Sequence, residues 1–301
     1  MFFFSLLFLG CSNQPHEDQM AIMEESPMNT EKSQVLIIAH RGARSLAPEN
    51  TIPAAVKAYE LGADGWELDV AMSLDGELVV LHDDTLERTS NAADIYPNRK
   101  PWLVYEFTLA ELQQLDFGSW FVEADPFEQI SQDQISPIDA TLYQGVQIPT
   151  LREALLYTQS NQWWVNVEIK DARGTFADAL IVSAVVELVE ALEMTDQVLV
   201  SSFNHDYLRQ VKALNPHIAT GALSSRSVRD PLDLMRSLDA QAFHPSLKVT
   251  SPEQVQLLVE NGYDVNVWTV NEIADMEKLI NMGVTGIITD FPQRLYPILH
   301  P

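Results

Sequence analysis

The sequence predicts a TIM-type (β/α)8 barrel, an α/β fold, with a small inserted subdomain after the third strand. Apolar runs of strand length alternate with amphipathic segments of helix length along most of the chain, which indicates a parallel sheet covered by helices. No glycine-rich dinucleotide fingerprint follows the first apolar run, so an open doubly wound sheet is less favoured. Polar residues gather directly after the apolar runs, and barrels carry their functional groups at these carboxyl ends of the strands.

The composition supports a large folded part. The chain has 301 residues, of which 46% are hydrophobic and 20% charged, so it can bury a sizeable core. Its 18 basic and 43 acidic residues give a net charge of −25, which argues against nucleic acid as a partner because the phosphate backbone would be repelled. A single cysteine excludes a disulfide scaffold and a cysteine-based zinc cluster. No feature of the sequence predicts a protein partner.

The first 33 residues form a separate part. Residues 1–11 are apolar and end at Cys11, as in a secretory signal that is too short to span a bilayer. The last four, FLGC, resemble a bacterial lipobox, in which the cysteine receives lipid chains. Residues 12–33 are acidic without an apolar period, which predicts a flexible tether to a folded part at 34–301. We expect a lipid anchor on Cys11 in the bacterial cell envelope, on the periplasmic or extracellular side; the alternative is an ordinary buried cysteine.

The first elements of the folded part follow from short-range patterns. The apolar residues 35–39 predict a strand that is buried on both faces. Asn50 is a suitable N-cap for a helix over 51–61. Two further strands are expected at 65–70 and 78–81, joined by an Asp-Gly turn without a helix between them.

Residues 83–147 break this rhythm. They hold twelve Asp or Glu and three Lys or Arg, together with several prolines. They also carry the large aromatic side chains Trp102, Phe117, Trp120 and Phe121, which a disordered linker would lack. The stretch is therefore expected to be the inserted subdomain.

The alternation resumes after residue 147 and continues towards the end of the chain. The expected helices lie at 151–159, 175–192, 206–214, 230–238, 252–261 and 272–282, and the expected strands at 164–169, 198–202, 218–223, 241–244, 264–268 and 286–288. This makes nine strand-like runs, one more than a closed eight-stranded barrel contains. The pair joined without a helix, 65–70 and 78–81, is the least regular part of the pattern.

Two histidines and an arginine follow apolar strands. His40 and Arg41 come directly after the first strand, and Gly42 allows the backbone to turn sharply there. His82 ends the third strand. Histidine transfers protons near neutral pH, and the guanidinium group of arginine fits phosphate oxygens. In isolation, such a pair would equally suit a cap or a salt bridge.

Three carboxylates also stand at strand ends. Glu67 and Asp69 are two positions apart on one strand and therefore point to the same face, and Glu168 lies near the end of a later strand. Neighbouring carboxylates repel each other unless one is protonated or a cation lies between them. Ligands that are all oxygen suit Ca²⁺ or Mg²⁺ rather than Zn²⁺, so these residues predict a site for one divalent cation.

These groups together point to a phosphodiester. Lys170 shares a strand face with Glu168 and, with Arg41, can face an anion beside the cation site. His40 and His82 can remove a proton from an attacking oxygen and protonate a leaving oxygen, and a phosphodiester needs both transfers. A glycosidase would use two carboxylates and leave both histidines without a role.

Seven motifs in order along the chain resemble the glycerophosphodiester phosphodiesterases: HRGARSLAPENT, ELDV, LHDDTLERT, VEIK, SSFNHDYL, VNVWTVN and GIITDFP. The resemblance covers nearly all of 34–301. It implies a barrel of the phosphatidylinositol-phospholipase-C-like type with an insertion after the third strand. It also implies hydrolysis of small glycerophosphodiesters to sn-glycerol 3-phosphate and an alcohol, with a divalent cation.

The resemblance further implies a role for each matching residue. By this match the acid–base pair is His40 and His82, and the metal ligands are Glu67, Asp69 and Glu168. The substrate- or phosphate-binding residues are Arg41 and Lys170, which contact the phosphate, Glu49, which orders the site from the first loop, and Phe203 and Trp268, which line the substrate end.

Alternative functions stay open at this point. An enzyme of the same barrel type could cleave lysophospholipids or act like a phospholipase D, and an anchor on Cys11 would hold it near such substrates. A lipoprotein could instead bind phosphodiesters without cleaving them, although binding alone does not need two histidines. Attack by water and attack by the neighbouring glycerol hydroxyl, through a cyclic phosphate, are both compatible with the residues, and either histidine could be the base.

Overall fold

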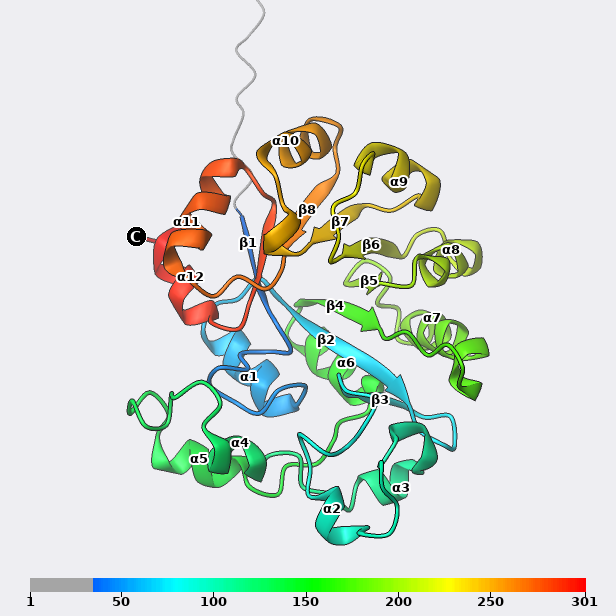
Figure 1. Cartoon of the computed structure of the whole chain (residues 1–301), viewed down its shortest axis with the longest axis vertical. Coiled ribbons are helices and arrows are strands. Elements are labelled where there is room, and N and C mark those ends of the chain that lie inside the picture. Colours follow the sequence, from blue (N-terminus) through cyan, green and yellow to red (C-terminus); the bar gives the residue numbers. More distant parts are fainter. Residues whose placement is uncertain (1–34) are drawn as a thin grey trace, which may run out of the picture. The chain divides into compact units, whose positions relative to one another are not determined.

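The computed structural model describes residues 35–301, which form a closed barrel of eight parallel strands (Figure 1). Neighbouring strands pair in the order β1-β9-β8-β7-β6-β5-β4-β2, and β1 pairs with β2 to close the ring. The barrel strands are β1 (Leu36–Ala39), β2 (Gly65–Met72), β4 (Trp164–Ile169), β5 (Val198–Ser202), β6 (Ala219–Ser224), β7 (Ala242–Pro245), β8 (Asp264–Val267) and β9 (Gly286–Thr289). The predicted TIM barrel is confirmed.

The ninth strand lies outside the ring. β3 (Leu78–Val80) runs antiparallel to the end of β2, with Val80 opposite Val70. A tight turn that includes Gly76, at φ +84°, can join antiparallel strands, whereas a parallel return needs a long crossover. The insertion thus follows the third strand of the chain, but it falls between the second and third strands of the barrel.

Helices cover the outside of the ring (Figure 1). They are α1 (Ile52–Glu60), α6 (Leu151–Ser160), α7 (Ile181–Ala191), α8 (His205–Leu214), α9 (Pro231–Leu238), α10 (Pro252–Glu260), α11 (Ile273–Met282) and α12 (Pro292–Leu299), with a short 3-10 turn η3 (Leu247–Val249). The main core fills the space between the helices and the strands. Val165 and Val167 of β4 belong to this core, so the alternate residue Glu168 faces the barrel interior.

Two helices differ from the expectation. The helix expected over 175–192 is divided into η2 (Phe176–Ala179) and α7, because Leu180 between them has φ −120°, outside the helical range. The sequence pattern did not predict α12, whose interior contains Pro297. A proline inside a helix removes a backbone hydrogen bond, and here the buried side of α12 packs near β1.

The insertion builds its own small cores. Its elements are α2 (Ala92–Ile95), η1 (Val104–Glu106), α3 (Leu109–Leu112), α4 (Ser119–Ala124) and α5 (Pro137–Tyr143). Trp102 and Phe117 are buried in one apolar cluster and Phe121 in another, so the insertion is folded rather than a linker. Trp120 is half-buried and packs edge-on against Phe121.

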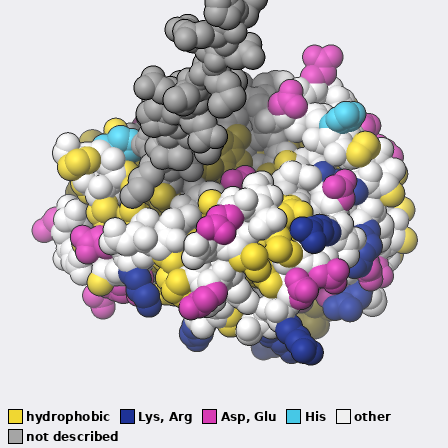
Figure 2. All heavy atoms as spheres, turned by 90° about the horizontal axis from the view of Figure 1, so that it is seen from above, with side chains coloured by type: hydrophobic (Ala, Val, Ile, Leu, Met, Phe, Trp, Pro, Cys, Tyr) yellow, Lys and Arg dark blue, Asp and Glu magenta, His cyan; other side chains and the backbone are white. Residues whose placement is uncertain are grey.

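The surface carries charge of both signs. On the face shown in Figure 2, acidic side chains are spread among basic and apolar ones rather than gathered into one patch. Within residues 35–301, no helix has both the length and the apolar character that crossing a bilayer requires. The expected signal and tether, 1–11 and 12–33, lie outside the described residues and remain predictions.

Candidate active site

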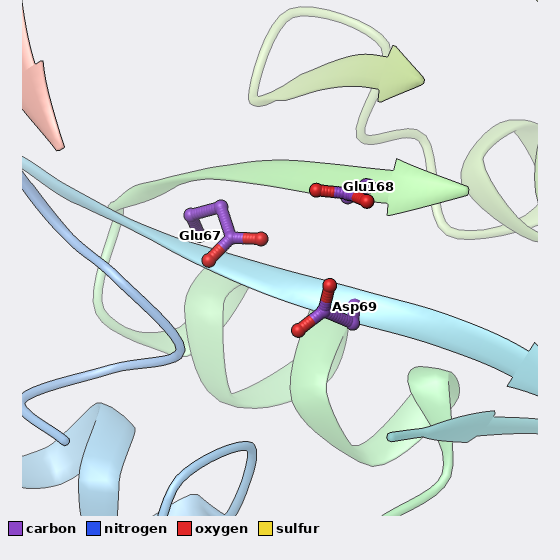
Figure 3. Close-up of side chains that lie close together, drawn as sticks. All are labelled: Glu67, Asp69 and Glu168. Carbon is purple, nitrogen blue, oxygen red and sulfur yellow. The ribbon is translucent and has the colours of Figure 1, made fainter. Parts of the chain in front are cut away.

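Three buried carboxylates lie together inside the barrel, on β2 and β4 (Figure 3). Parallel pairing places Asp69 opposite Glu168, and Glu67 lies two residues before Asp69 on the same face. One oxygen from each residue lies within 4.8 Å of the others. The structure thus brings the three expected metal ligands together.

Repulsion between these buried carboxylates favours the binding of a cation. Burial raises the pKa of Glu67 well above its ordinary value, and the charges of Asp69 and Glu168 raise it further. Burial would also raise the pKa of Asp69, but Arg41 and Lys170 hold it below its ordinary value. Oε1 of Glu67 is buried and has no hydrogen-bond partner among residues 35–301. An all-oxygen cluster with an unsatisfied buried oxygen fits Ca²⁺ or Mg²⁺.

A cavity of about 100 Å³ opens beside the carboxylates, and we call it the central cavity. Its charged and polar lining is His40, Arg41, Glu67, His82, Asn166, Glu168, Lys170 and Thr269, and its apolar lining is Phe203, Leu223, Trp268 and Ile288. Both expected catalytic histidines, both expected phosphate contacts and both expected aromatic residues therefore face one space. Glu49 is not among its lining residues.

Each of the two histidines is paired with an aspartate. Nδ1 of His40 lies 2.6 Å from Oδ1 of Asp290, the residue that follows β9. Nδ1 of His82 lies 2.6 Å from Oδ1 of Asp83. Because a carboxylate accepts a hydrogen bond, each ring carries its proton on Nδ1 and leaves Nε2 to exchange a proton in the central cavity.

Two positively charged side chains, those of Lys170 and Arg41, lie beside the carboxylates. Lys170 donates to Oε1 of Glu168 at 2.9 Å, and its Nζ lies 3.5 Å from Oδ1 of Asp69. The backbone N–H of Arg41 donates to Glu67 at 2.9 Å, and its Nε lies 3.3 Å from Oδ2 of Asp69. Burial would lower the pKa of Lys170, but the two neighbouring carboxylates raise it above its ordinary value, so this group stays charged.

Glu49 is buried outside the lining of the central cavity and is held by three arginines. Its Oε1 accepts hydrogen bonds from Arg41 at 2.8 Å and from Arg88 at 2.7 Å, and its Oε2 accepts from Arg44 at 2.7 Å and from Arg88 at 3.0 Å. Burial would raise the pKa of Glu49, but Arg88 and the other two arginines lower it to about 2. The carboxylate is therefore ionised and contacts arginines rather than the space for a substrate.

Phe203 and Trp268 meet edge-on, with ring centroids 5.4 Å apart. Trp268 is fixed by a hydrogen bond from its indole N–H to the backbone oxygen of His244 at 2.8 Å. Phe203 is 43% exposed, so it stands where the cavity opens to solvent. The two rings give the central cavity one apolar wall.

Sequence reasoning missed several residues of the site. Asp83 and Asp290 lie inside the motifs LHDDTLERT and GIITDFP. Each is a carboxylate that closely follows an apolar strand run ending at the site, and this position could have identified both as site residues. Asn50 was expected to cap α1, but Thr51 caps it, accepting from the N–H of Ala54. The Asn50 amide instead donates to Oδ2 of Asp69 at 2.9 Å and orients this carboxylate.

Comparison with known proteins agrees with this geometry. The model of the glycerophosphoryl diester phosphodiesterase family matches residues 40–294. A glycerophosphodiester phosphodiesterase of Caldanaerobacter subterraneus subsp. tengcongensis is 37% identical over 260 residues, which cover 86% of this chain and 96% of that protein. One from Bacillus altitudinis is 33% identical over 265 residues, 87% of this chain and 97% of that protein.

A solved structure of similar fold extends the comparison. The Oleispira antarctica phosphodiesterase in complex with the product sn-glycerol-3-phosphate has a TM-score of 0.75 and 31% identity. The match covers 88% of this chain and 97% of that one. Taken with the barrel, the paired histidines and the carboxylate cluster, these matches show that the chain belongs to the glycerophosphodiester phosphodiesterase family and is a phosphoric diester hydrolase.

Proposed function

We propose that this enzyme hydrolyses glycerophosphodiesters to sn-glycerol 3-phosphate and an alcohol, using one bound divalent cation and the histidines His40 and His82. One observation carries the proposal: both histidines, each held by an aspartate, line the same central cavity as the carboxylates Glu67 and Glu168. The sn-glycerol-3-phosphate bound to the Oleispira antarctica phosphodiesterase supports the glycerol half of the substrate.

The two histidines handle the two protons of the reaction. One imidazole accepts the proton of the attacking oxygen at Nε2 while a new P–O bond forms. The other, protonated at Nε2, gives its proton to the oxygen of the leaving alcohol as the old P–O bond breaks. Asp290 and Asp83 hold the two rings in the orientation that turns Nε2 away from each carboxylate.

Glu67, Asp69 and Glu168 would hold the cation. When bound, Ca²⁺ or Mg²⁺ supplies positive charge that offsets the negative charge on the phosphoryl oxygens. The carboxylates are pre-positioned by the chain itself, since the backbone N–H of Arg41 binds Glu67 and the Asn50 amide binds Asp69. Little rearrangement is then needed when a cation arrives.

Arg41 and Lys170 contact the phosphate in this proposal. Both line the central cavity, and both are cations within 3.5 Å of a carboxylate oxygen of Asp69. The net charge of −25 opposes an anionic substrate in the cavity only weakly, because charges more than about 8 Å away from the substrate are screened at physiological ionic strength. The local cations therefore decide the binding of the phosphate.

The test is release of sn-glycerol 3-phosphate from glycerophosphocholine and glycerophosphoethanolamine by the purified full chain, with Ca²⁺, Mg²⁺ or EDTA present. We expect release that depends on the cation and stops in EDTA. Release that persists unchanged in EDTA would refute the role of the cation. Following the reaction by ³¹P NMR separates the routes, because attack by the neighbouring glycerol hydroxyl passes through a cyclic phosphate and attack by water does not.

Variants and a second substrate complete the test. Replacing His40 or His82 with alanine should lower kcat by several orders of magnitude. His217→Ala, at an exposed histidine, is the matched control and should leave kcat unchanged. Cleavage of lysophosphatidylcholine without cleavage of glycerophosphocholine would favour a lipid-cleaving enzyme of the same barrel type. Binding of glycerophosphocholine with no release at all would favour a lipoprotein that only captures phosphodiesters.

We also propose that lipid chains on Cys11 hold the enzyme in the bacterial cell envelope, on the periplasmic or extracellular side. The support is the sequence alone: an apolar segment at 1–11 that ends in FLGC, followed by an acidic stretch at 12–33.

A further inference from the structure

A second cavity lies next to the central cavity. It measures about 210 Å³ and is walled by the insertion on one side and by the loop between β4 and α7 on the other. Lys170 lines both cavities, and Asp84, which lines the second, is two residues beyond His82, which lines the first. The second cavity therefore adjoins the central cavity at Lys170 and near His82.

The walls of the second cavity are fixed in place. On the insertion side, the backbone oxygen of Asp84 accepts from the N–H of Val104 at 3.0 Å. On the loop side, the Tyr207 hydroxyl accepts from the N–H of Ala172 at 3.2 Å and donates to Asp178 at 2.5 Å. A cavity held by hydrogen bonds on both sides is preformed for a ligand.

The lining combines an apolar surface with one unbalanced charge. Met72, Val104 and Ile181 are buried apolar residues of the wall, and Tyr105 is half-buried. Asp171 and Arg173 also line the cavity, but they bind each other through hydrogen bonds of 2.8 and 2.9 Å, so their charges cancel.

Asp84 supplies the charge that remains. Within residues 35–301, neither a cation nor a hydrogen-bond donor contacts its carboxylate. Lys170, the fourth charged residue of the lining, already binds Glu168 and lies near Asp69. The second cavity therefore presents one unpaired carboxylate at Asp84, an aromatic ring at Tyr105 and apolar walls, which is the combination that recognises an alkylated ammonium group.

We propose that this second cavity binds the alcohol half of the substrate and favours alcohols that carry a cationic nitrogen. The inference rests on the proposed function, because a glycerophosphate half in the central cavity directs the other ester arm past Lys170 and His82. Asp84 attracts the cationic nitrogen, and the Tyr105 ring and the apolar wall cover its carbon atoms. Asp84 and Tyr105 are then the residues that determine specificity.

The experiment compares kcat/KM for glycerophosphocholine, which has a cationic alcohol, and glycerophosphoglycerol, which has a neutral one. In the Asp84→Asn variant we expect kcat/KM for glycerophosphocholine to fall about fivefold, as for loss of one exposed charge contact, with little change for glycerophosphoglycerol. Tyr105→Ala should lower the ratio of kcat/KM for glycerophosphocholine to kcat/KM for glycerophosphoglycerol. Tyr105→Phe should keep this ratio, since the ring and not the hydroxyl makes the contact.

Two controls make the result specific. Asp94→Asn removes the same charge from an exposed position of the insertion that lines neither cavity, so it should leave the substrate ratio unchanged. Inhibition by sn-glycerol 3-phosphate, which occupies only the central cavity in this proposal, should be the same in all variants. Asp84 is exposed, so its replacement leaves the fold intact.

The outcomes separate this inference from the proposed function. If the wild type hydrolyses both substrates but Asp84→Asn and Tyr105→Ala leave their ratio unchanged, the inference is wrong and the proposed function stands. An equal fall for both substrates, or a fall in Asp94→Asn as large as in Asp84→Asn, also refutes it. If the wild type hydrolyses neither substrate with any cation, the proposed function fails and this inference fails with it.

Discussion

Arg88 binds both carboxylate oxygens of Glu49, at 2.7 and 3.0 Å, and through Glu49 the two histidines of the central cavity belong to one network. The same guanidinium donates from Nε to Asp83 at 2.7 Å, and Asp83 holds His82. On the other side, Arg44 binds Glu49 at 2.7 Å and lies 3.6 Å from Asp290, which holds His40. A single buried carboxylate thus joins the His82–Asp83 pair, which is formed by adjacent residues, to the His40–Asp290 pair, whose members are 250 positions apart.

This position makes Glu49 important for stability. Its pKa of about 2 lies below the ordinary 4.5, so it contributes stability that is present above pH 4.5 and is lost as the pH falls towards 2. We expect Glu49→Gln to lower the free energy of unfolding at pH 7 by about 3 kcal/mol and by only about 1 kcal/mol at pH 3. Urea unfolding of variant and wild type at both values measures this difference.

Glu60→Gln is the matched control for this measurement. Glu60 is exposed and, within residues 35–301, forms an ion pair only with Lys57, at 3.0 Å, so its replacement should change stability by less than about 0.5 kcal/mol at either pH. A loss in Glu49→Gln that stays the same from pH 7 to pH 3 would show that shape, and not the charge of the carboxylate, holds the three arginines.

The aspartate behind each histidine should matter for turnover more than for folding. Asp290→Asn replaces an acceptor with a group that can donate, so the imidazole of His40 loses the partner that keeps the proton on Nδ1. We expect kcat to fall about 10²- to 10⁴-fold while circular dichroism still shows a folded protein. Asp233→Asn, an exposed change on α9, is the control. Full activity of Asp290→Asn would show that the ring is oriented by other contacts.

Much of the fold was predictable because buried parallel strands are apolar runs. The strands expected at 164–169 and 198–202 have these bounds in the structure, since packing on both faces leaves little room for polar residues. The carboxylates Glu67 and Asp69 were predictable for a related reason: strand alternation alone places them on one face.

The rest depends on contacts between distant parts of the chain. His40 and Asp290 are 250 positions apart, and only closure of the ring by β1 and β9 brings them together. Asn50 was expected to cap α1 because asparagine is a common N-cap residue, but its backbone has φ +58° and its side chain binds Asp69 instead. No local pattern carries either fact.

The envelope anchor can be tested in cells. We expect the full-length chain to incorporate labelled palmitate and to fractionate with membranes, and Cys11→Ala to lose the label and leave the membrane fraction, because Cys11 is the only cysteine of the chain. Hydrolytic activity in the cell lysate should be unchanged, since residues 35–301 form the barrel and the candidate active site. Equal labelling and fractionation of the variant would contradict the lipid anchor.

The carboxylate cluster should make the stability of the enzyme depend on divalent cations. Without a cation, Glu67, Asp69 and Glu168 repel one another, and a cation that binds only the folded state stabilises it by mass action. At a hundredfold excess over its Kd, Ca²⁺ or Mg²⁺ should raise the melting temperature of the wild type by about 5 °C, and EDTA should reverse this together with activity. The cation that gives the larger shift at equal concentration is the better ligand.

Glu67→Gln tests whether this shift comes from the cluster. The change keeps the size of the side chain but removes one charge, so repulsion falls and the melting temperature without cation should be no lower than that of the wild type. The shift with cation and the hydrolytic activity should both disappear, whereas Glu60→Gln should keep both. A variant that retains the full thermal shift but lacks activity would place the cation elsewhere and leave Glu67 a role in turnover alone, so the two readouts distinguish the metal site from the reacting groups beside it.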